Sequence, residues 1–459
     1  MKVPEAWKIK RGHRASWAVW SSIVLFFAIV TGVALAGANL IYLGVALAPL
    51  VLYFCMEKPF IFPFGVYAFL IPFDEVLSTT ESGHGATLTR FLGIMTILTL
   101  TLKIIFEDKL ARPGSAALWS VLLVLFGLLS AVWAIDPALV ISLLPTAAGL
   151  LLMYLVAGSY RLRKSEFETL EWCIFAGGFL AAIYVIYNFM TGSFFYDTSR
   201  VSMVVGDRIS DPNYFAYTLI MPVAVCIHMM LNRKEKALQA LFLVTLGVII
   251  FGVIVTGSRG GMIGVLSVLA VYLMATDRKI VFTTGIIAVA VVLLQFIPDM
   301  FFARINEGIE TGGAGRVDVL YVVWKALEKY WLFGAGMSNC VKAFSEFYIY
   351  SPSFRGHEMG AHNLYLGTFV ELGVAGFALL AVMIVKHYRM ISVKLGKNSE
   401  DIMISASFWG TLVTSFFLDP MFRKSFWLLW MMILMYGNIK YKRHSDQVVR
   451  TGAREVESF

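Results

Sequence analysis

Charged residues are scarce in this chain. Of its 459 residues, 15% are charged and 59% are hydrophobic, whereas a soluble domain is typically about half apolar and a quarter charged. The composition therefore excludes an ordinary soluble domain. The apolar residues gather in blocks of about 20, the length that crosses a bilayer as a helix, and backbone in lipid must satisfy its own hydrogen bonds. We predict an all-α, polytopic integral membrane protein.

Cysteine is scarce as well, and its spacing excludes two further classes. The four cysteines are widely scattered, and none belongs to a Cys-x-x-Cys pair, so we expect neither a disulfide framework nor a zinc site. Residues 1–18 lack a short apolar core followed by a small-residue cleavage site, so we expect the first apolar run to be retained as a span. The net charge of +8 indicates topology-setting loops and anionic lipid rather than a nucleic-acid partner.

The apolar blocks predict about 12–14 transmembrane helices. Three of the blocks (59–73, 260–276 and 425–438) are short. The expected spans are 17–36, 39–56, 59–73, 88–105, 116–134, 138–157, 170–190, 214–231, 238–256, 260–276, 280–297, 363–386, 402–418 and 425–438.

The distribution of Lys and Arg predicts the orientation. With the N-terminus in the cytoplasm, most of the 38 Lys and Arg residues and every short basic loop fall on the cytoplasmic side, as is usual for membrane proteins. Both termini are then cytoplasmic, and the largest outer segments are residues 298–362 and 191–213. In the longer segment, apolar residues recur at three- and four-residue spacing over residues 316–331, which predicts a helix. Such a helix suits the membrane interface, with Trp324 and Tyr330 at headgroup level.

Three cationic or titratable residues stand on the predicted outer face. Arg259 lies in Thr-Gly-Ser-Arg-Gly-Gly between two spans, Arg316 follows Gly-Gly-Ala-Gly at the start of the predicted loop helix, and His362 precedes a span. A guanidinium binds a diphosphate as a bidentate fork, glycine lets backbone amides approach phosphate, and a helix N-terminus adds positive potential. A neutral histidine can take the proton of an attacking sugar hydroxyl. The three residues therefore suit transfer from a polyprenyl-diphosphate sugar without a metal.

Each of the three also has a structural interpretation. Arg259 suits a snorkelling anchor at a helix end, Arg316 a solvated loop residue, and His362 an interfacial or helix-capping residue. His84 and His357 show that histidine is not rare on that side. The functional interpretation depends on the sequence context that the three residues share.

Four segments supply that context in order. They are Asp-Pro-Asn-Tyr-Phe-Ala at 211–216, Gly-Ser-Arg-Gly-Gly at 257–261, Gly-Arg at 315–316 with Trp324 and Leu-Phe-Gly-Ala-Gly at 332–336, and His362-Asn363 with Tyr365, Leu366, Glu371, Gly373 and Gly376. Together they resemble the O-antigen ligase and polymerase family over residues 205–385. We accordingly divide the chain into an N-terminal transmembrane bundle (1–204), a catalytic region (205–385) that includes the outer loop 298–362, and C-terminal transmembrane helices with a cytoplasmic tail (386–459).

The resemblance implies a fold, an activity and a set of site residues. It implies a GT-C-type glycosyltransferase of the bacterial inner membrane that moves a glycan from undecaprenyl diphosphate to an acceptor on the periplasmic face. It makes Arg259, Arg316 and His362 the essential residues, and it implies neither a metal nor another cofactor. The implied partners are the lipid-linked donor, a glycan or lipid A–core acceptor, membrane lipid and proteins of polysaccharide assembly. One departure is Trp331, where relatives often have proline, and it puts the geometry of that loop in question.

Four further residues are candidates for binding the diphosphate or the glycan: Arg208, Asp211, Asn213 and Asn363. Asp211 and Asn213 also fit a turn and a helix N-cap, and we favour that structural interpretation. Arg208 ranks below the two family arginines. We also favour a structural role for Glu371, which lies in a predicted span, because a carboxylate in the membrane needs a partner.

The sequence leaves the acceptor open. A ligase passes the glycan to lipid A–core, and a polymerase adds it to another lipid-linked repeat of O-antigen or exopolysaccharide; both use the same donor chemistry. A transporter or flippase without chemistry is the alternative from a different class. Transporters usually place charges near the bilayer midplane, whereas the notable cations here stand at one surface. A protein O-oligosaccharyltransferase is a third option.

Overall fold

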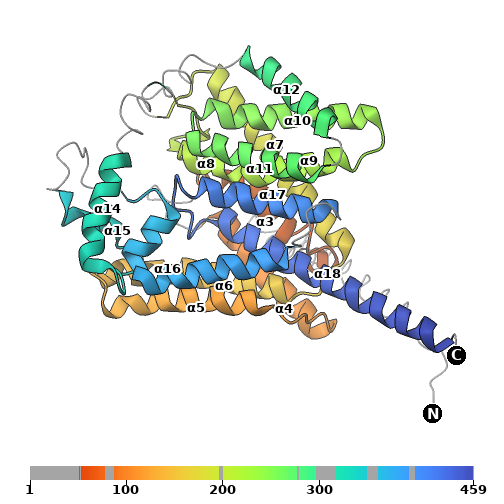
Figure 1. Cartoon of the computed structure of the whole chain (residues 1–459), viewed down its shortest axis with the longest axis horizontal. Helices are drawn as coiled ribbons and strands as arrows, with labels where there is room; N and C mark the ends of the chain where they lie inside the picture. The colour runs from red at the N-terminus through yellow and green to blue at the C-terminus, as the bar shows by residue number, and fades with distance from the viewer. Residues whose placement is uncertain are drawn as a thin grey trace, which may run out of the picture.

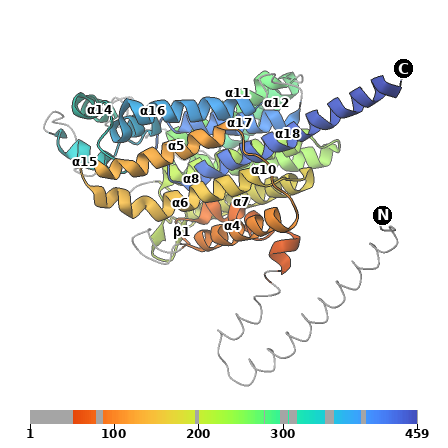
Figure 2. The ribbon, with the colours of Figure 1, turned by 90° about the horizontal axis from the view of Figure 1, so that it is seen from below.

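The structure is a computed structural model that describes residues 51, 53–77, 87–195, 200–276, 279–295, 306, 316–348, 360–391 and 398–457, with only the backbone described at 281, 294, 316–318 and 441–457. The first predicted span and most of the second lie outside these residues. The long helices run side by side along the long axis of an elongated bundle (Figure 1, Figure 2).

The described helices of the bundle overlap the predicted spans from 59–73 onward, which confirms the all-α class, although α18 continues well beyond the predicted end at residue 438. Their bounds are α3 Phe64–Leu70 continued by the 3₁₀ turn η1 Ile71–Phe73, α4 Leu88–Phe106, α5 Ser115–Leu129 continued by η2 Ser130–Val132, α6 Pro137–Ser159, α7 Lys164–Met190, α8 Pro212–Thr218, α9 Ile220–Leu231, α10 Lys236–Val255, α11 Arg259–Ala275, α12 Lys279–Leu294, α16 Leu364–Met390, α17 Ser399–Thr414 and α18 Lys424–Glu457.

Among the described residues, seven helices are long and apolar enough to cross a membrane. They are Leu88–Phe106, Ser115–Val132, Pro137–Ser159, Lys164–Met190, Pro212–Leu231, Lys236–Val255 and Leu364–Met390. Shorter apolar helices, such as α11, lie beside them. The chain is thus a multi-pass membrane protein, and the total of twelve to fourteen spans stays a prediction.

The outer surface of the bundle is apolar, as lipid contact requires. In α4, Phe91, Leu98 and Ile105 are all more than half exposed, while Leu92 and Leu100 on the other face are buried. Large apolar side chains that recur along an exposed helix face are unfavourable in water. They are stable against lipid tails, which agrees with the spans.

Four of the described elements, two helices and two strands, lie outside the bundle helices. The predicted loop helix is present as α14, Arg316–Tyr330, and a short helix, α15, spans Cys340–Ser345. Figure 1 shows α14 running across the direction of the long helices at one end of the bundle. The strands β1, Val204–Val205, and β2, Arg208–Ile209, form an antiparallel hairpin that pairs Val205 with Arg208.

Contacts between loops show which of them lie at the same end of the bundle. At one end, which we call the basic end, Lys109 donates to the Tyr160 hydroxyl at 2.9 Å and Lys164 pairs with Glu400 at 3.0 Å. Both contacts join loops or helix ends that the charge distribution assigns to the cytoplasm.

At the other end, which we call the site end, loops that are predicted to lie outside contact one another. The Asp211 N–H donates to Glu75 at 2.9 Å, and the Asp136 N–H donates to Asn339 Oδ1 at 2.8 Å. The contacts therefore agree with the predicted alternation of loops. The compartment that each end faces stays a prediction.

The buried apolar residues that the structure describes form two cores. The larger core runs through the bundle, and the smaller one joins α14 and α15 to the start of α16 through residues such as Val323, Ala343 and Val370. Gly373 interrupts α16 with a non-helical backbone (φ +63°, ψ −167°). The segment before the break, residues 364–372, is called the α16 head. It belongs to both cores, because Leu364 and Leu372 lie in the larger and Val370 in the smaller.

Candidate functional site

Arg259 is the first residue of α11. The Ser258 hydroxyl caps this helix by accepting from the Gly261 N–H at 3.2 Å, as serine commonly does at an N-terminus. Arg259 is half-buried, and in the described part of the chain neither its guanidinium nor the N–H groups of Arg259 and Gly260 have a hydrogen-bond or ion-pair partner. A helix N-terminus concentrates positive potential. These groups can therefore donate hydrogen bonds to an anion without breaking a contact with another described residue.

The two glycines after Arg259 bring α11 against its neighbours. A Cβ on Gly260 would lie 2.6 Å from the Phe417 Cβ, and a Cβ on Gly261 would lie 2.7 Å from the Ala216 Cβ. Real Cβ atoms do not approach so closely. The start of α11 therefore packs directly on α8 and on the loop between α17 and α18, residues 415–423.

The start of α8 is capped as the sequence predicts. Asp211 Oδ1 accepts from the N–H groups of Asn213 at 2.8 Å and Tyr214 at 3.1 Å. This contact confirms the N-cap for Asp211. A role of Asp211 or Asn213 in binding glycan stays a prediction.

Arg200 connects the starts of α8 and α11, and the sequence analysis missed it. Its guanidinium donates to Asn213 Oδ1 at 2.8 Å and to the Thr256 carbonyl at 3.1 Å. The Ser258 N–H in turn donates to the Thr256 hydroxyl at 3.1 Å. Arg200 thus joins Asn213 to the turn that presents Arg259, and no sequence motif marks it.

A second missed arginine lies in the 415–423 loop. Arg423 pairs with Glu75, and its Cζ lies 3.8 Å from the centroid of the Tyr214 ring. The Tyr214 hydroxyl donates to the Asp419 carbonyl at 2.8 Å. Burial raises the pKa of Glu75, opposed by the charge of Arg423, and burial also raises the pKa of Asp419. This network holds the start of α8 against the 415–423 loop.

His362 and Asn363 precede the α16 head. His362 is exposed and adopts a positive φ of +43°, which is uncommon outside glycine. Asn363 Oδ1 caps α16 by accepting from the N–H groups of Tyr365 at 2.9 Å and Leu366 at 3.0 Å, and its Nδ2 donates to the Phe416 carbonyl at 3.1 Å. The cap holds His362 beside the 415–423 loop. A substrate contact by Asn363 stays a prediction.

The 415–423 loop thus gathers the starts of three helices. It contacts α8 through Tyr214, α11 through Gly260 and α16 through Asn363. The structure therefore brings Arg259, Asp211, Asn213, His362 and Asn363 to one region of the site end.

Two predicted residues stand apart from these contacts. Arg208 is half-buried in β2, where its backbone pairs with Val205, and its side chain makes no hydrogen bond or ion pair within the described part of the chain. Arg316 is confirmed as the first residue of α14, and only its backbone is described. Its helix packs on the α16 head through the smaller core.

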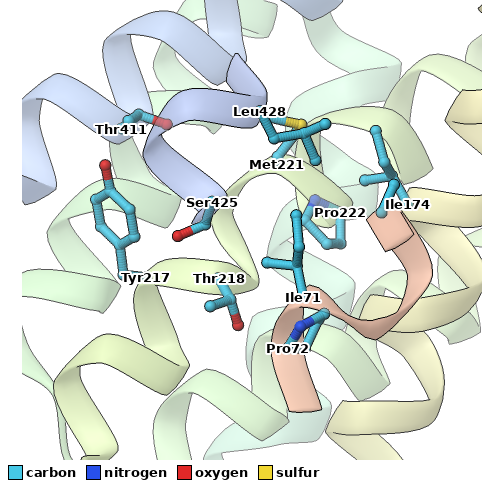
Figure 3. A pocket seen from close by; sticks show the side chains of 11 residues that line it. Ile71, Pro72, Ile174, Tyr217, Thr218, Met221, Pro222, Thr411, Ser425 and Leu428 are labelled. Carbon is cyan, nitrogen blue, oxygen red and sulfur yellow. The ribbon is translucent and has the colours of Figure 1, made fainter. Parts of the chain in front are cut away.

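A small cavity lies deeper in the bundle (Figure 3). Its free volume is about 20 Å³, enough for one water molecule. It is too small for a sugar or a diphosphate, and Pro72, Met221 and Leu428 contribute an apolar lining. The candidate site is therefore the surface at the site end rather than this cavity.

Residues 241–381 match the family model described as O-antigen ligase. The match runs from α10 into α16 and includes Arg259, Arg316 and His362, whereas Arg200 and Arg423 lie outside it. It supports assignment of the chain to the O-antigen ligase family and indicates a glycan-transferring enzyme. No curated protein matches the chain.

Proposed function

We propose that this member of the O-antigen ligase family transfers a glycan from undecaprenyl diphosphate to an acceptor at the site end, without a metal. The observation that carries the proposal is the start of α11. There a half-buried guanidinium and two N–H groups, none of which has a partner among the described residues, stand at one helix N-terminus. This arrangement is suited to a dianionic leaving group.

Arg259 binds the donor diphosphate in this proposal. A guanidinium and backbone N–H groups together neutralise charge that builds on the leaving oxygen as the glycosidic bond breaks. Because Arg259 has no ion-pair partner among the described residues, no ion pair with any of them has to open before the diphosphate binds. In this proposal Arg316, the first residue of α14, supplies a second guanidinium to the diphosphate.

His362 acts as the general base. Its exposed side chain can reach a hydroxyl of an arriving acceptor, and a neutral imidazole takes that proton as the oxygen attacks the anomeric carbon. The positive φ at His362 is a local departure of the kind that clusters at functional sites. Undecaprenyl diphosphate leaves as the new glycosidic bond forms.

The membrane arrangement agrees with a lipid-linked donor. The carrier lipid holds the diphosphate at headgroup level, and the site end lies where helices begin or end. On α14, Trp324 is 68% exposed and Leu320 is 51% exposed, on the face opposite the buried Val322 and Val323. An amphipathic helix with such a face lies in the membrane interface. We infer that the site end faces the periplasm, since the basic end carries the short loops rich in Lys and Arg.

Ligation and polymerisation differ in their acceptor, and a reaction with purified components distinguishes the two. Purified protein in lipid vesicles receives a polyprenyl-diphosphate-linked repeat unit, with or without lipid A–core. Product that appears only with lipid A–core identifies a ligase, and a ladder without it identifies a polymerase. Protein that is folded and binds the donor but yields neither product contradicts glycan transfer.

A further inference from the structure

The break in α16 creates a need for hydrogen-bond partners. A membrane helix that is interrupted frees carbonyl and N–H groups, and in or near lipid these must be satisfied by neighbouring protein. At Gly373 the freed groups include the carbonyls of Val370 and Glu371 and the N–H of Val374. The segment that satisfies them is residues 331–339, between α14 and α15, which we call the strap.

The strap pairs with the break through its backbone. The N–H groups of Ala335 and Gly336 donate to the carbonyls of Val370 and Glu371 at 2.9 and 2.8 Å. In the opposite direction, the Val374 N–H donates to the Trp331 carbonyl at 2.8 Å. The Leu-Phe-Gly-Ala-Gly motif at 332–336 therefore supplies hydrogen bonds to backbone groups that the break in α16 leaves free.

The other edge of the strap pairs with the loop between α5 and α6. The Ile135 N–H donates to the Ala335 carbonyl at 2.9 Å, and Trp133 Nε1 donates to the Phe333 carbonyl at 3.1 Å. The Met337 N–H donates to the Ser130 hydroxyl at 2.8 Å. The strap is thus held on both sides, by the bundle and by the α16 break.

Two glycines make this pairing possible. Gly334 and Gly373 both have positive φ, at +78° and +63°. A Cβ on Gly334 would overlap the Glu371 backbone, and a Cβ on Gly373 would overlap the Leu332 carbonyl. The obstacles are backbone atoms, which cannot turn aside as a flexible side chain can, so alanine at either position forces the two segments apart.

The strap also contributes to both cores, through Met337 in the larger and Ala335 in the smaller. It continues directly from α14, whose first residue is Arg316. It also forms backbone hydrogen bonds with the α16 head, which follows His362. Arg259 begins α11, whose residues Val265 and Val268 belong to the larger core. We propose that the strap positions Arg316 and His362 relative to Arg259, and that Gly334 and Gly373 are positioning residues for glycan transfer. This inference rests on the proposed function.

The test compares Gly334→Ala and Gly373→Ala with Gly149→Ala. Gly149 is a matched control, because it lies in α6 with no atom within 4 Å of a built Cβ. Spin labels at Glu328→Cys on α14 and Met190→Cys at the end of α7 report the distance between the cores. Both positions are well exposed, and the native cysteines are buried or half-buried. The distance distribution and the kinetics are measured on the same proteins in lipid.

We expect both strap variants to shift or broaden the distance distribution, and the control to match the wild type. Because a misplacement of about 1 Å can cost about 100-fold in rate, kcat should fall at least about tenfold. The KM for the donor should rise by a smaller factor than kcat falls, since Arg259 stays in place and Arg316 is the one donor-binding arginine that shifts with the strap. Unchanged distances, or full kcat with changed distances, overturn the proposal.

A milder variant keeps the test decisive if the glycine variants do not fold. Trp133→Phe removes the Nε1 bond to Phe333 and preserves the ring contact between these residues, whose centroids lie 5.9 Å apart. We expect a broadened distance distribution and a smaller loss of kcat, and no change in either refutes the strap's role. If the wild type transfers no glycan, the proposed function fails, and the distance measurement still reports on the strap.

Discussion

Replacing Arg259 with alanine should weaken donor recognition and leave the fold intact. The guanidinium is half-buried and has no partner in the part of the chain that the structure describes, so its removal leaves no opposing charge unpaired. Surface changes of this kind alter stability by about 0.5 kcal/mol or less. A hydrogen bond to a charged group contributes about 1.5–3 kcal/mol. The expected loss in kcat/KM for the donor is therefore about 10- to 150-fold.

Arg423→Ala is the matched control for this prediction. Arg423 pairs with Glu75 and stacks on Tyr214, and its side chain is 42% exposed. Exposed ion pairs contribute about 0.2–1 kcal/mol, and a cation–π contact at an exposed site about 0.5–1 kcal/mol. Arg423→Ala should therefore lower stability by about 1–2 kcal/mol, in contrast to Arg259→Ala.

The assay combines thermal unfolding with initial rates in lipid vesicles at several donor concentrations. Arg259→Lys, which keeps the charge and loses the fork, should recover only part of the activity. Full kcat/KM in Arg259→Ala would refute the assignment of the diphosphate site. A loss of stability as large as that of Arg423→Ala would show that Arg259 is a structural residue.

Three further predictions concern the neighbouring residues. His362→Ala should lower turnover by about 100-fold or more and leave donor binding within about twofold; equal loss of binding and turnover would contradict a base. Asp211→Asn, which still caps α8, should keep activity and stability, whereas Asp211→Ala should lose about 1 kcal/mol of stability; an inactive but stable Asp211→Asn would indicate a substrate contact. Burial raises the folded-state pKa of Asp419, so the protonated carboxyl group stabilises the folded state. This contribution to stability is fully present below the unfolded pKa of about 4 and is lost as pH rises through the folded pKa. Asp419→Asn should therefore raise the melting temperature at neutral pH and flatten its fall from pH 4 to 7, and an unchanged slope would contradict burial as the cause.

Local sequence patterns were sufficient to predict the bundle and α14. Apolar blocks of span length predict helices wherever they occur, and the three- and four-residue spacing from Arg316 predicted a helix that the structure places at Arg316–Tyr330. The cap by Asp211 was predictable for the same reason, since its partners are the next residues along the chain. Each of these features depends only on neighbours in sequence.

The connections between segments were not predictable in this way. Arg200 contacts Thr256, and Arg423 contacts Glu75. These residues lie too far apart in the sequence for a periodic pattern to relate them. The break in α16 was also missed, because Gly373 within an apolar run is compatible with a continuous helix. Its cause is the strap, whose backbone replaces the lost helical bonds. Tertiary partners, rather than local preference, determined each of these features.

The most direct measurement of the central claim counts both products of one reaction. Vesicles that contain the protein, the polyprenyl-diphosphate-linked glycan and the acceptor are assayed together for elongated or ligated glycan and for free polyprenyl diphosphate. The account predicts that the wild type releases one polyprenyl diphosphate for each glycosidic bond formed, and that Arg259→Ala and His362→Ala each yield at least about tenfold less of both products within the same time. Movement of the donor across the bilayer with no release of polyprenyl diphosphate would contradict it and identify a transporter.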